Sequence, residues 1–151
     1  MTKEELKIRL TGVIPEATFD EAGEFLNVFI SPSECHAVME KLRNKTEFGF
    51  DYLSCLTCVD WKDHFMMVYH LFSRTHKITL VVKSKLTDRD NAQIETVCDI
   101  WRTAEFHERE VYDLFGVRFL RHPDLRRLFL DENWPGYPLR KDYVDENMIE
   151  I

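Results

Sequence analysis

The sequence predicts an α+β fold of two layers, in which a mixed or antiparallel β-sheet packs with helices and an irregular C-terminal arm follows. Helical periods occur near the N-terminus and again from residue 104, and β-prone segments lie between them. Two of those segments flank a short polar turn, which is typical of a hairpin. No sustained period follows residue 121. We therefore expect an α+β core domain over residues 1–120 and an extended arm over residues 121–151.

The first element expected is a short amphipathic helix over residues 2–9. Thr2 and Glu5 have the spacing of a capping box, in which each side chain accepts a hydrogen bond from the other residue's backbone N–H. Gly12 and Pro15 are both poor helix formers, so we expect them to end this helix.

A strand and a second helix follow. Residues 25–30 are apolar and read as a strand, and Ser31 then offers a cap with Pro32 at the first helical position. We expect this helix to run to about residue 43. One stripe of it is apolar, with Cys35, Val38, Met39 and Leu42 at helical spacing.

The middle of the chain is β-prone. Residues 48–59 are aromatic and partly alternating, and residues 65–72 and 78–82 read as two strands of a hairpin joined by residues 73–76. Residues 88–100 are ambiguous, because their apolar positions fit either a helix stripe or an extended segment.

The last regular elements are a helix over residues 104–115 and a short strand over residues 117–119. Gly116 supplies the C-terminal stop of the helix. The spacing also predicts i,i+4 ion pairs along it, Glu105 with Arg109 and Arg109 with Asp113.

Composition bounds the function. The chain has 151 residues and is 44% hydrophobic, which suits one domain with an ordinary core. Its 20 basic and 27 acidic residues give a net charge of −7, which disfavours nucleic-acid binding. No apolar run of about 18 residues occurs, and the N-terminus lacks the features of a secretory signal. We therefore expect a soluble intracellular protein.

Charges and aromatic side chains gather toward the C-terminus. Acids and bases balance over residues 101–143, and arginine replaces lysine as the dominant base. Arginine tolerates desolvation better than lysine and binds carboxylates in a bidentate manner. The basic pairs could serve solubility alone, but Trp134 and two tyrosines beside them are typical of interface hot spots. We favour an interface, and expect the arm to need another surface before it orders.

The pair Cys55 and Cys58 has the two-residue spacing of a metal or redox site. A zinc site usually takes four ligands, and no second pair of this kind exists in the sequence. A small metal or disulfide redox protein therefore stays a minor alternative, and packed positions in the sheet are the favoured interpretation.

No catalytic constellation is visible. The segment from His107 to Val111 begins like a zinc-protease helix but has valine where the second histidine is required. Glu108 and Glu110 point to different sides of a helix, so they do not form a general acid/base pair. We expect no active site and no metal site in this chain.

Three sequence blocks stand out in the C-terminal part of the chain. They are Glu108-Arg109-Glu110-Val111-Tyr112-Asp113-Leu114-Phe115, then His122-Pro123 with Arg126-Arg127, then Gly136-Tyr137-Pro138-Leu139-Arg140-Lys141-Asp142-Tyr143. Taken together, these blocks resemble the 30-kDa subunit family of respiratory complex I, also called the C subunit of NADH-quinone oxidoreductase. The resemblance covers residues 48–143 and is most specific after residue 107. Many members have glycine before the His-Pro pair, where this chain has Arg121.

The resemblance implies a non-catalytic peripheral-arm subunit of a proton-translocating NADH:quinone oxidoreductase. It implies docking on the 49-kDa-type subunit of the quinone site, on the cytoplasmic side of the bacterial inner membrane, with membrane contact only through the complex. No cofactor is expected on this chain, and NADH, FMN, quinone and iron–sulfur clusters belong to the whole complex. The alternative is the equivalent subunit of a membrane-bound nickel-iron hydrogenase or of a ferredoxin- or F420-linked complex.

The same blocks supply the expected docking positions. The resemblance gives them as positions that dock on the partner or shape its site, and Trp134 joins them as an interface aromatic. They are Glu108, Arg109, Asp113, His122, Arg126, Arg127, Trp134, Arg140, Lys141 and Asp142.

Overall fold

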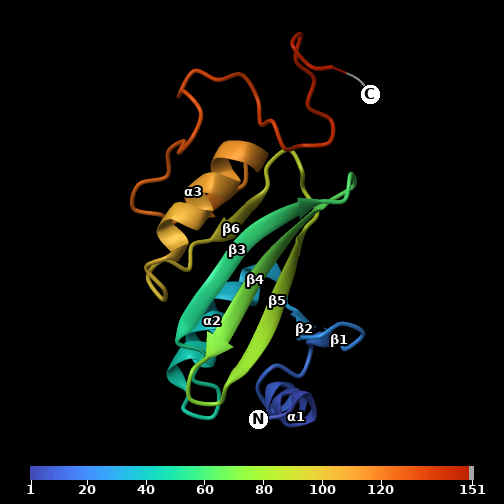
Figure 1. Cartoon of the computed structure of the whole chain (residues 1–151), viewed down its shortest axis with the longest axis vertical. Helices are drawn as coiled ribbons and strands as arrows, with labels where there is room; N and C mark the ends of the chain where they lie inside the picture. The colour runs from blue at the N-terminus through green and yellow to red at the C-terminus, as the bar shows by residue number, and fades with distance from the viewer. Residues whose placement is uncertain (150–151) are drawn as a thin grey trace.

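A computed structural model describes residues 1–149 of the chain (Figure 1). Within these residues, three helices and seven strands follow one another. In order they are α1 (Lys3–Val13), β1 (Thr18–Asp20), β2 (Leu26–Phe29), the 3-10 turn η1 (Pro32–Glu34), α2 (Cys35–Asn44), β3 (Tyr52–Asp60), β4 (Phe65–Ser73), β5 (Ile78–Leu86), β6 (Gln93–Glu95), α3 (Ala104–Phe115) and β7 (Arg118–Leu120).

The main sheet has five strands in the order β1-β2-β5-β4-β3. Strand β2 runs parallel to β5 and the other neighbours are antiparallel, so the sheet is mixed. Strands β6 and β7 form a separate parallel pair. The expected α+β class, with a mixed sheet, helices and an irregular C-terminal segment, is confirmed.

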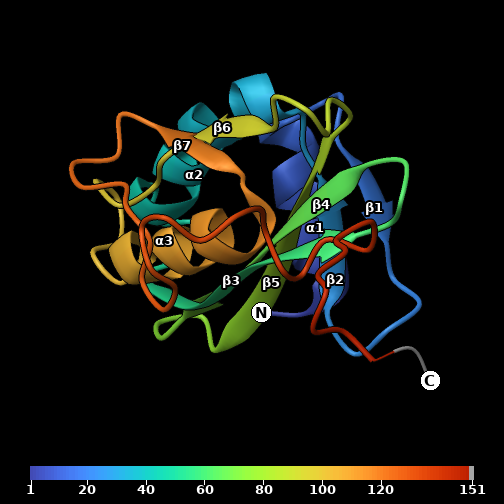
Figure 2. The ribbon, with the colours of Figure 1, turned by 90° about the horizontal axis from the view of Figure 1, so that it is seen from above.

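The hydrophobic core lies on one side of the sheet, where α2 and α3 pack (Figure 2). Strand β4 shows why, because its alternate residues Phe65, Met67, Tyr69 and Leu71 are all fully buried. Helix α2 adds the apolar stripe that was expected, and all four of its members are buried.

Helix α1 confirms the capping box. The Thr2 hydroxyl accepts from the Glu5 N–H, and the Glu5 carboxylate accepts from the Thr2 N–H, both at 3.2 Å. The expected end is wrong, because the helix runs through Gly12 to Val13. A Cβ added at Gly12 would meet no atom of another element within 4 Å, so no close contact requires glycine there.

Several boundaries differ from those expected. The expected strand from residue 48 begins at Tyr52, because the buried Phe48 and Phe50 belong to the turn after α2. The helix after Ser31 begins as a 3-10 turn, and the Ser31 side chain contacts Ser33 rather than a backbone N–H. The ambiguous residues 88–100 contain β6 followed by turns.

No helix within residues 1–149 is both long and apolar enough to cross a bilayer. Beyond β7, the described part of the chain holds neither helix nor strand. We call residues 121–149 the arm. Figure 1 shows it in orange to red, passing over α3.

Arg121 joins β7 to the arm in a left-handed conformation, with φ of 66°. Glycine adopts this region without steric cost, whereas a residue with a Cβ is strained there. The glycine found here in many family members is therefore explained by backbone geometry. The exposed Arg121 side chain adds an ion pair to Glu95 at 3.2 Å, which is a weak surface contact.

This conformation predicts the effect of two substitutions. Arg121→Gly should leave the free energy of unfolding within about 1 kcal/mol of wild type, because relief of strain offsets the added freedom of the unfolded chain. Arg121→Val should destabilise by about 1–2 kcal/mol, because a β-branched residue tolerates positive φ worst. Urea unfolding of both variants checks this, and equal stability of the two would contradict the assignment.

Candidate functional site

Helix α3 carries three charged side chains into the protein interior. Glu108, Arg109 and Asp113 are all at most 5% exposed. The helix ends at Gly116, whose φ of 80° and N–H bond to the Tyr112 carbonyl close the last turn. Charged groups are rarely buried unless they are paired. The partners of these three groups define the candidate site.

The partners of Asp113 come from the arm. Its carboxylate accepts hydrogen bonds from the backbone N–H groups of Leu128, Phe129 and Leu130, at 2.7–3.3 Å. Arg127 adds a fourth donor at 3.1 Å. Burial alone would raise the pKa of the Asp113 carboxyl, but these donors outweigh burial and lower it. The carboxylate therefore stays ionised and holds the arm on α3.

Arg109 also turns to the arm. It donates to the backbone carbonyls of Arg126 and Arg127 at 3.1 and 2.9 Å. The expected helix pairs of Arg109 with Glu105 and Asp113 are therefore wrong. The cause is that the arm offers carbonyl acceptors in the interior, and Asp113 takes Arg127 as its ion-pair partner instead.

Arg127, on the arm, hydrogen-bonds both to α3 and to later residues of the arm. Its guanidinium donates to the Asp113 backbone carbonyl and to the carbonyls of Trp134 and Gly136, each at 2.9 Å. The side chain is only 8% exposed. Arg127 thus crosslinks two turns of the arm and α3, and it is not a free surface base.

Three arginines and two aromatic rings form a continuous stack between the arm and the domain. In order these are Arg89, Phe65, Arg140, Tyr137 and Arg127. The guanidinium carbons lie 4.6–5.1 Å from the ring centroids, which suits cation–π attraction. We call this the arginine–aromatic stack. Its end members pair with Asp60 and Asp113, through Arg89 and Arg127 respectively.

Asp60 anchors the far end of the arm. It pairs with both terminal nitrogens of Arg89, and it accepts from the backbone N–H groups of Lys62 and Lys141 at 2.8 and 2.9 Å. Burial would raise the pKa of the Asp60 carboxyl, but the Arg89 and backbone donors lower it well below its ordinary value. A strand end thus holds a segment that is 81 residues away in the chain.

Glu108 makes a different contact. It accepts from the Thr96 hydroxyl and from the Val97 N–H, so it fixes the turn after β6. Its nearest base within residues 1–149 is His122, 3.9 Å away and without side-chain exposure. Burial raises the pKa of the Glu108 carboxyl to about 7, because the two hydrogen bonds do not make up for its lost hydration.

His122 is held by two backbone contacts. The Asp124 N–H donates to Nδ1 at 3.0 Å, so Nε2 carries the proton and donates to the Glu105 carbonyl at 3.0 Å. Donor atoms of Cys98, Glu108 and His122 lie within 4.8 Å of one another, and zinc accepts ligands of these types. However, both imidazole nitrogens already serve the backbone. Glu108 and His122 thus bond to other parts of the chain, and His122 joins α3 to the start of the arm.

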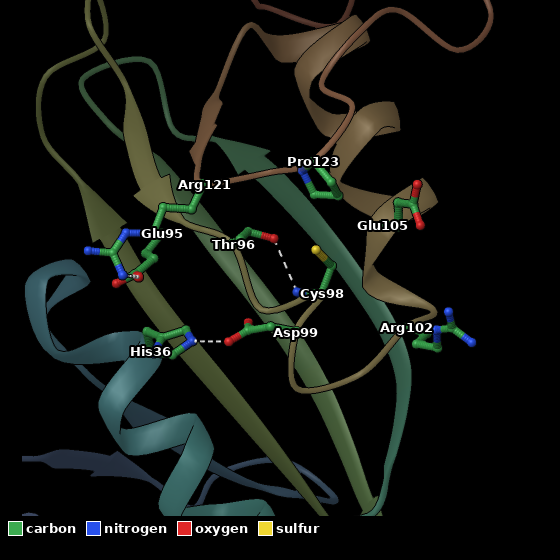
Figure 3. A pocket seen from close by; sticks show the side chains of 9 residues that line it. All are labelled: His36, Glu95, Thr96, Cys98, Asp99, Arg102, Glu105, Arg121 and Pro123. Carbon is green, nitrogen blue, oxygen red and sulfur yellow. Dashed lines mark hydrogen bonds and ion pairs between the residues drawn. The ribbon is translucent and has the colours of Figure 1, made fainter.

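A pocket of about 480 Å³ opens beside Cys98 (Figure 3). His36 on α2 pairs with Asp99 at 2.8 Å across it, and Cys98 donates its N–H to the Thr96 hydroxyl. Burial raises the pKa of the Cys98 thiol, which makes it a weak nucleophile. The pocket therefore does not assemble a nucleophile with a base.

Cys55 and Cys58 do not form one site. They lie on β3, where Cys58 is buried toward the core and Cys55 is half-buried on the other face, since residues three apart on a strand point opposite ways. Burial raises the pKa of the Cys58 thiol to about 12. The favoured interpretation of packed sheet positions agrees with this placement.

The remaining expected docking residues lie at the surface. Within the described chain Arg126 pairs only with Asp124 beside it, and the Asp142 side chain is 69% exposed while it touches Arg89. Lys141 is exposed, and Trp134 is 37% exposed. The expected set therefore divides into inner residues that hold the arm and outer residues that face solvent. The arm also exposes large apolar side chains, Phe129, Leu139, Val144, Met148 and Ile149.

The sequence reasoning missed part of the site. Phe65 and Arg89 were not expected to act, although Arg89 is the last arginine before the arginine-rich region. The expectation that the arm needs another surface before it orders stays a prediction. In the structure the arm contacts the chain's own α3 and the end of β3, through Asp113, Arg109 and Asp60.

The fold and the site define a small α+β domain whose buried helix charges bind its own C-terminal arm. The family described as "Respiratory-chain NADH dehydrogenase, 30 Kd subunit" matches residues 28–147. The chain belongs to this family.

Relatives and a solved structure agree with the family. The C/D subunit of NADH-quinone oxidoreductase from Phocaeicola vulgatus is 46% identical over 120 residues, which is 79% of this chain and 22% of that protein. The C subunit from Roseiflexus sp. is 36% identical over 140 residues, 89% of this chain and 79% of the relative. A chain of the membrane-bound sulfane sulfur reductase, an archaeal respiratory membrane complex, aligns with a TM-score of 0.75 at 26% identity, covering 93% of this chain and 85% of that one.

The contact of Asp113 with Arg127 and with the N–H groups of residues 128–130, which we call the clasp, predicts the effect of removing the Asp113 carboxylate. Asp113→Ala removes the acceptor of three part-buried N–H groups and the ion-pair partner of the Arg127 guanidinium, so the free energy of unfolding should fall by about 2–4 kcal/mol. Trypsin should then cut at Arg126 and Arg127 at least about tenfold faster, because the arm opens more often. The matched control is Asp124→Ala, whose exposed pair should matter by less than about 0.5 kcal/mol. Equal behaviour of the two variants would rule out the clasp.

The buried Glu108 predicts a pH dependence. Its folded pKa lies above the ordinary 4.5, so the folded chain holds this proton more tightly and stability falls as pH rises from about 4.5 to 7. Glu108→Gln removes this titration. Relative to wild type, the variant should gain about 2 kcal/mol between pH 5 and pH 8. Urea unfolding at both pH values measures it, and a pH-independent difference would contradict the shift.

Proposed function

We propose that the chain is the 30-kDa-type subunit of a proton-translocating NADH:quinone oxidoreductase, and that it acts by assembly rather than by catalysis. The observation that carries this proposal is the group of relatives named C/D, in which the C and D parts form one protein. This chain spans about a fifth of their length. Joining two modules on one chain is productive when they act side by side, so the fusion supports the D protein, of 49-kDa type, as partner.

The division of the expected docking residues into inner and outer ones also supports a role in assembly. The inner residues Glu108, Arg109, Asp113 and Arg127 use their hydrogen bonds within the chain. The exposed part of the arm presents large apolar and aromatic side chains among charges of both signs, and exposed apolar groups of this kind are typical of an interface. We propose that the inner residues and His122 hold the arm in its docking conformation. The residues that would face the partner are Arg126, Trp134, Arg140, Lys141 and Asp142.

The proposal assigns redox chemistry to other subunits. NADH, FMN, quinone and iron–sulfur clusters would be held elsewhere in the complex. The chain would lie on the cytoplasmic side of the bacterial inner membrane and reach the membrane only through its partners. Other peripheral-arm subunits would complete its surroundings.

A related complex is the second candidate. The match to a chain of an archaeal respiratory membrane complex supports an equivalent subunit in a membrane-bound nickel-iron hydrogenase or a ferredoxin- or F420-linked complex. Purification of the native complex from membranes separates the two. A NADH-oxidising flavoprotein should co-purify under the first proposal, and its absence together with a hydrogenase or ferredoxin-linked subunit would favour the second.

Docking is tested by charge reversal on the exposed arm. The double variant Arg126→Glu with Lys141→Glu should bind the 49-kDa-type protein at least about tenfold more weakly than wild type, and the loss should be larger at low salt. Lys41→Glu is the matched control, because this base is exposed on α2 and Figure 1 shows α2 away from the arm. Binding by titration calorimetry measures the effect. Unchanged affinity of the double variant would remove the ionic docking model.

A further inference from the structure

A second pocket, of about 540 Å³, lies between the arm and the domain. It opens beside the C-terminal end of α3, where Tyr112 and Gly116 form part of its wall. Arg118 on β7 and Tyr137 and Arg140 on the arm complete the polar lining. This pocket is separate from the one beside Cys98, since the two share no lining residue.

The lining carries more positive than negative charge. Arg118 and Arg140 supply two guanidinium groups, and Asp90 is the acid among the lining residues. Within residues 1–149 neither arginine has a carboxylate partner. Two tyrosines and Asn91 add neutral donors.

Arg140 is the one member of the arginine–aromatic stack without an acid among the described residues. Arg89 and Arg127 each pair with an aspartate, whereas Arg140 has Phe65 and Tyr137 on its faces and donates Nε to the Phe115 carbonyl at 2.6 Å. Its terminal nitrogens make no hydrogen bond within the described chain. Charge therefore stays uncompensated at the centre of the stack, next to open volume.

The Arg140 guanidinium is also held in place. A Cβ on Gly116 would lie 2.8 Å from its Nη2 and 2.7 Å from the Tyr137 ring, so both groups rest directly on glycine backbone. The Arg140 guanidinium lies against two aromatic rings and is fixed at Nε, which leaves the N–H groups of its terminal nitrogens as the donors without a partner in the described chain. These donors match a planar oxyanion, which accepts two parallel hydrogen bonds.

We infer that this pocket binds a carboxylate, supplied by an acidic side chain of the docking subunit. The identity of the protein that supplies the carboxylate rests on the proposed function. The preference of the pocket for a carboxylate rests on its lining residues alone. The partner carboxylate would supply the acid that Arg140 lacks and would pair with Arg118 at the rim. The partner would thereby recognise the arm in the conformation that the structure shows.

The pocket chemistry can be tested on the chain alone. Acetate is the probe, compared with chloride at equal ionic strength and at about ten times the acetate dissociation constant. The melting temperature of wild type should rise by about 2–4 °C in acetate over chloride. Arg118→Gln should lose this rise, since the Arg118 side chain makes no hydrogen bond or ion pair within residues 1–149 and its loss spares the fold. The exposed Arg102→Gln should keep it. A rise that persists in Arg118→Gln, or none in wild type, would overturn the inference.

The identity of the occupant is tested with the partner. Arg118→Gln should weaken binding to the 49-kDa-type protein about tenfold, Arg102→Gln should change it less than twofold, and acetate should compete with the wild-type complex. Loss of the acetate effect in the assembled complex supports a partner carboxylate. If acetate, or inorganic phosphate, still binds the assembled complex, the occupant is a free anion and the partner assignment is wrong. Absence of any wild-type binding to the partner would instead reject the proposed function while the acetate result stands.

Discussion

The buried carboxylate of Asp113 is the interaction on which the site depends. An ionised group at this depth is stable only when its oxygens are fully hydrogen-bonded, and α3 itself cannot provide such donors because its N–H groups are used along the helix. The arm provides them through Leu128 to Leu130 and Arg127. A single side chain on a rigid helix therefore dictates the path of a segment that has no regular structure of its own.

Two further contacts fix the arm, one at its start and one at residue 141. His122 ties the start of the arm to α3 through the Glu105 carbonyl, and Asp60 ties residue 141 to the end of β3. Between them the arginine–aromatic stack fills the space with groups that tolerate partial desolvation. The domain thus acts as a scaffold, and its buried charges serve the shape of the arm. What is left at the surface of the arm is a set of exposed apolar side chains among charges of both signs.

Hydrophobic periodicity and the residues at helix ends and turns made much of the fold predictable from the sequence. The helix at residues 104–115, its Gly116 stop and the β4–β5 hairpin follow from period and turn chemistry, and the structure has them at or near the expected bounds. Strand β1 was missed because three mostly exposed residues give no period.

The site was harder to predict than the fold. Helix spacing predicted a pair of Arg109 with Asp113, but acceptors and donors from the arm replaced it. No local pattern could bring Asp60 to Lys141 across 81 residues. Residue types indicated which side chains belong to the site, whereas only the fold shows which of them turn inward.

The central claim is that the chain's own helix orders its arm, and amide hydrogen exchange of the isolated chain tests it most directly. The account predicts that the amides of Leu128, Phe129 and Leu130 exchange at least about tenfold more slowly than that of the exposed Val144 in the same molecule. Asp113→Ala should abolish that difference. Exchange of the three amides at the rate of Val144 in the wild-type chain would contradict the account, and would mean that the arm takes its conformation only on a partner.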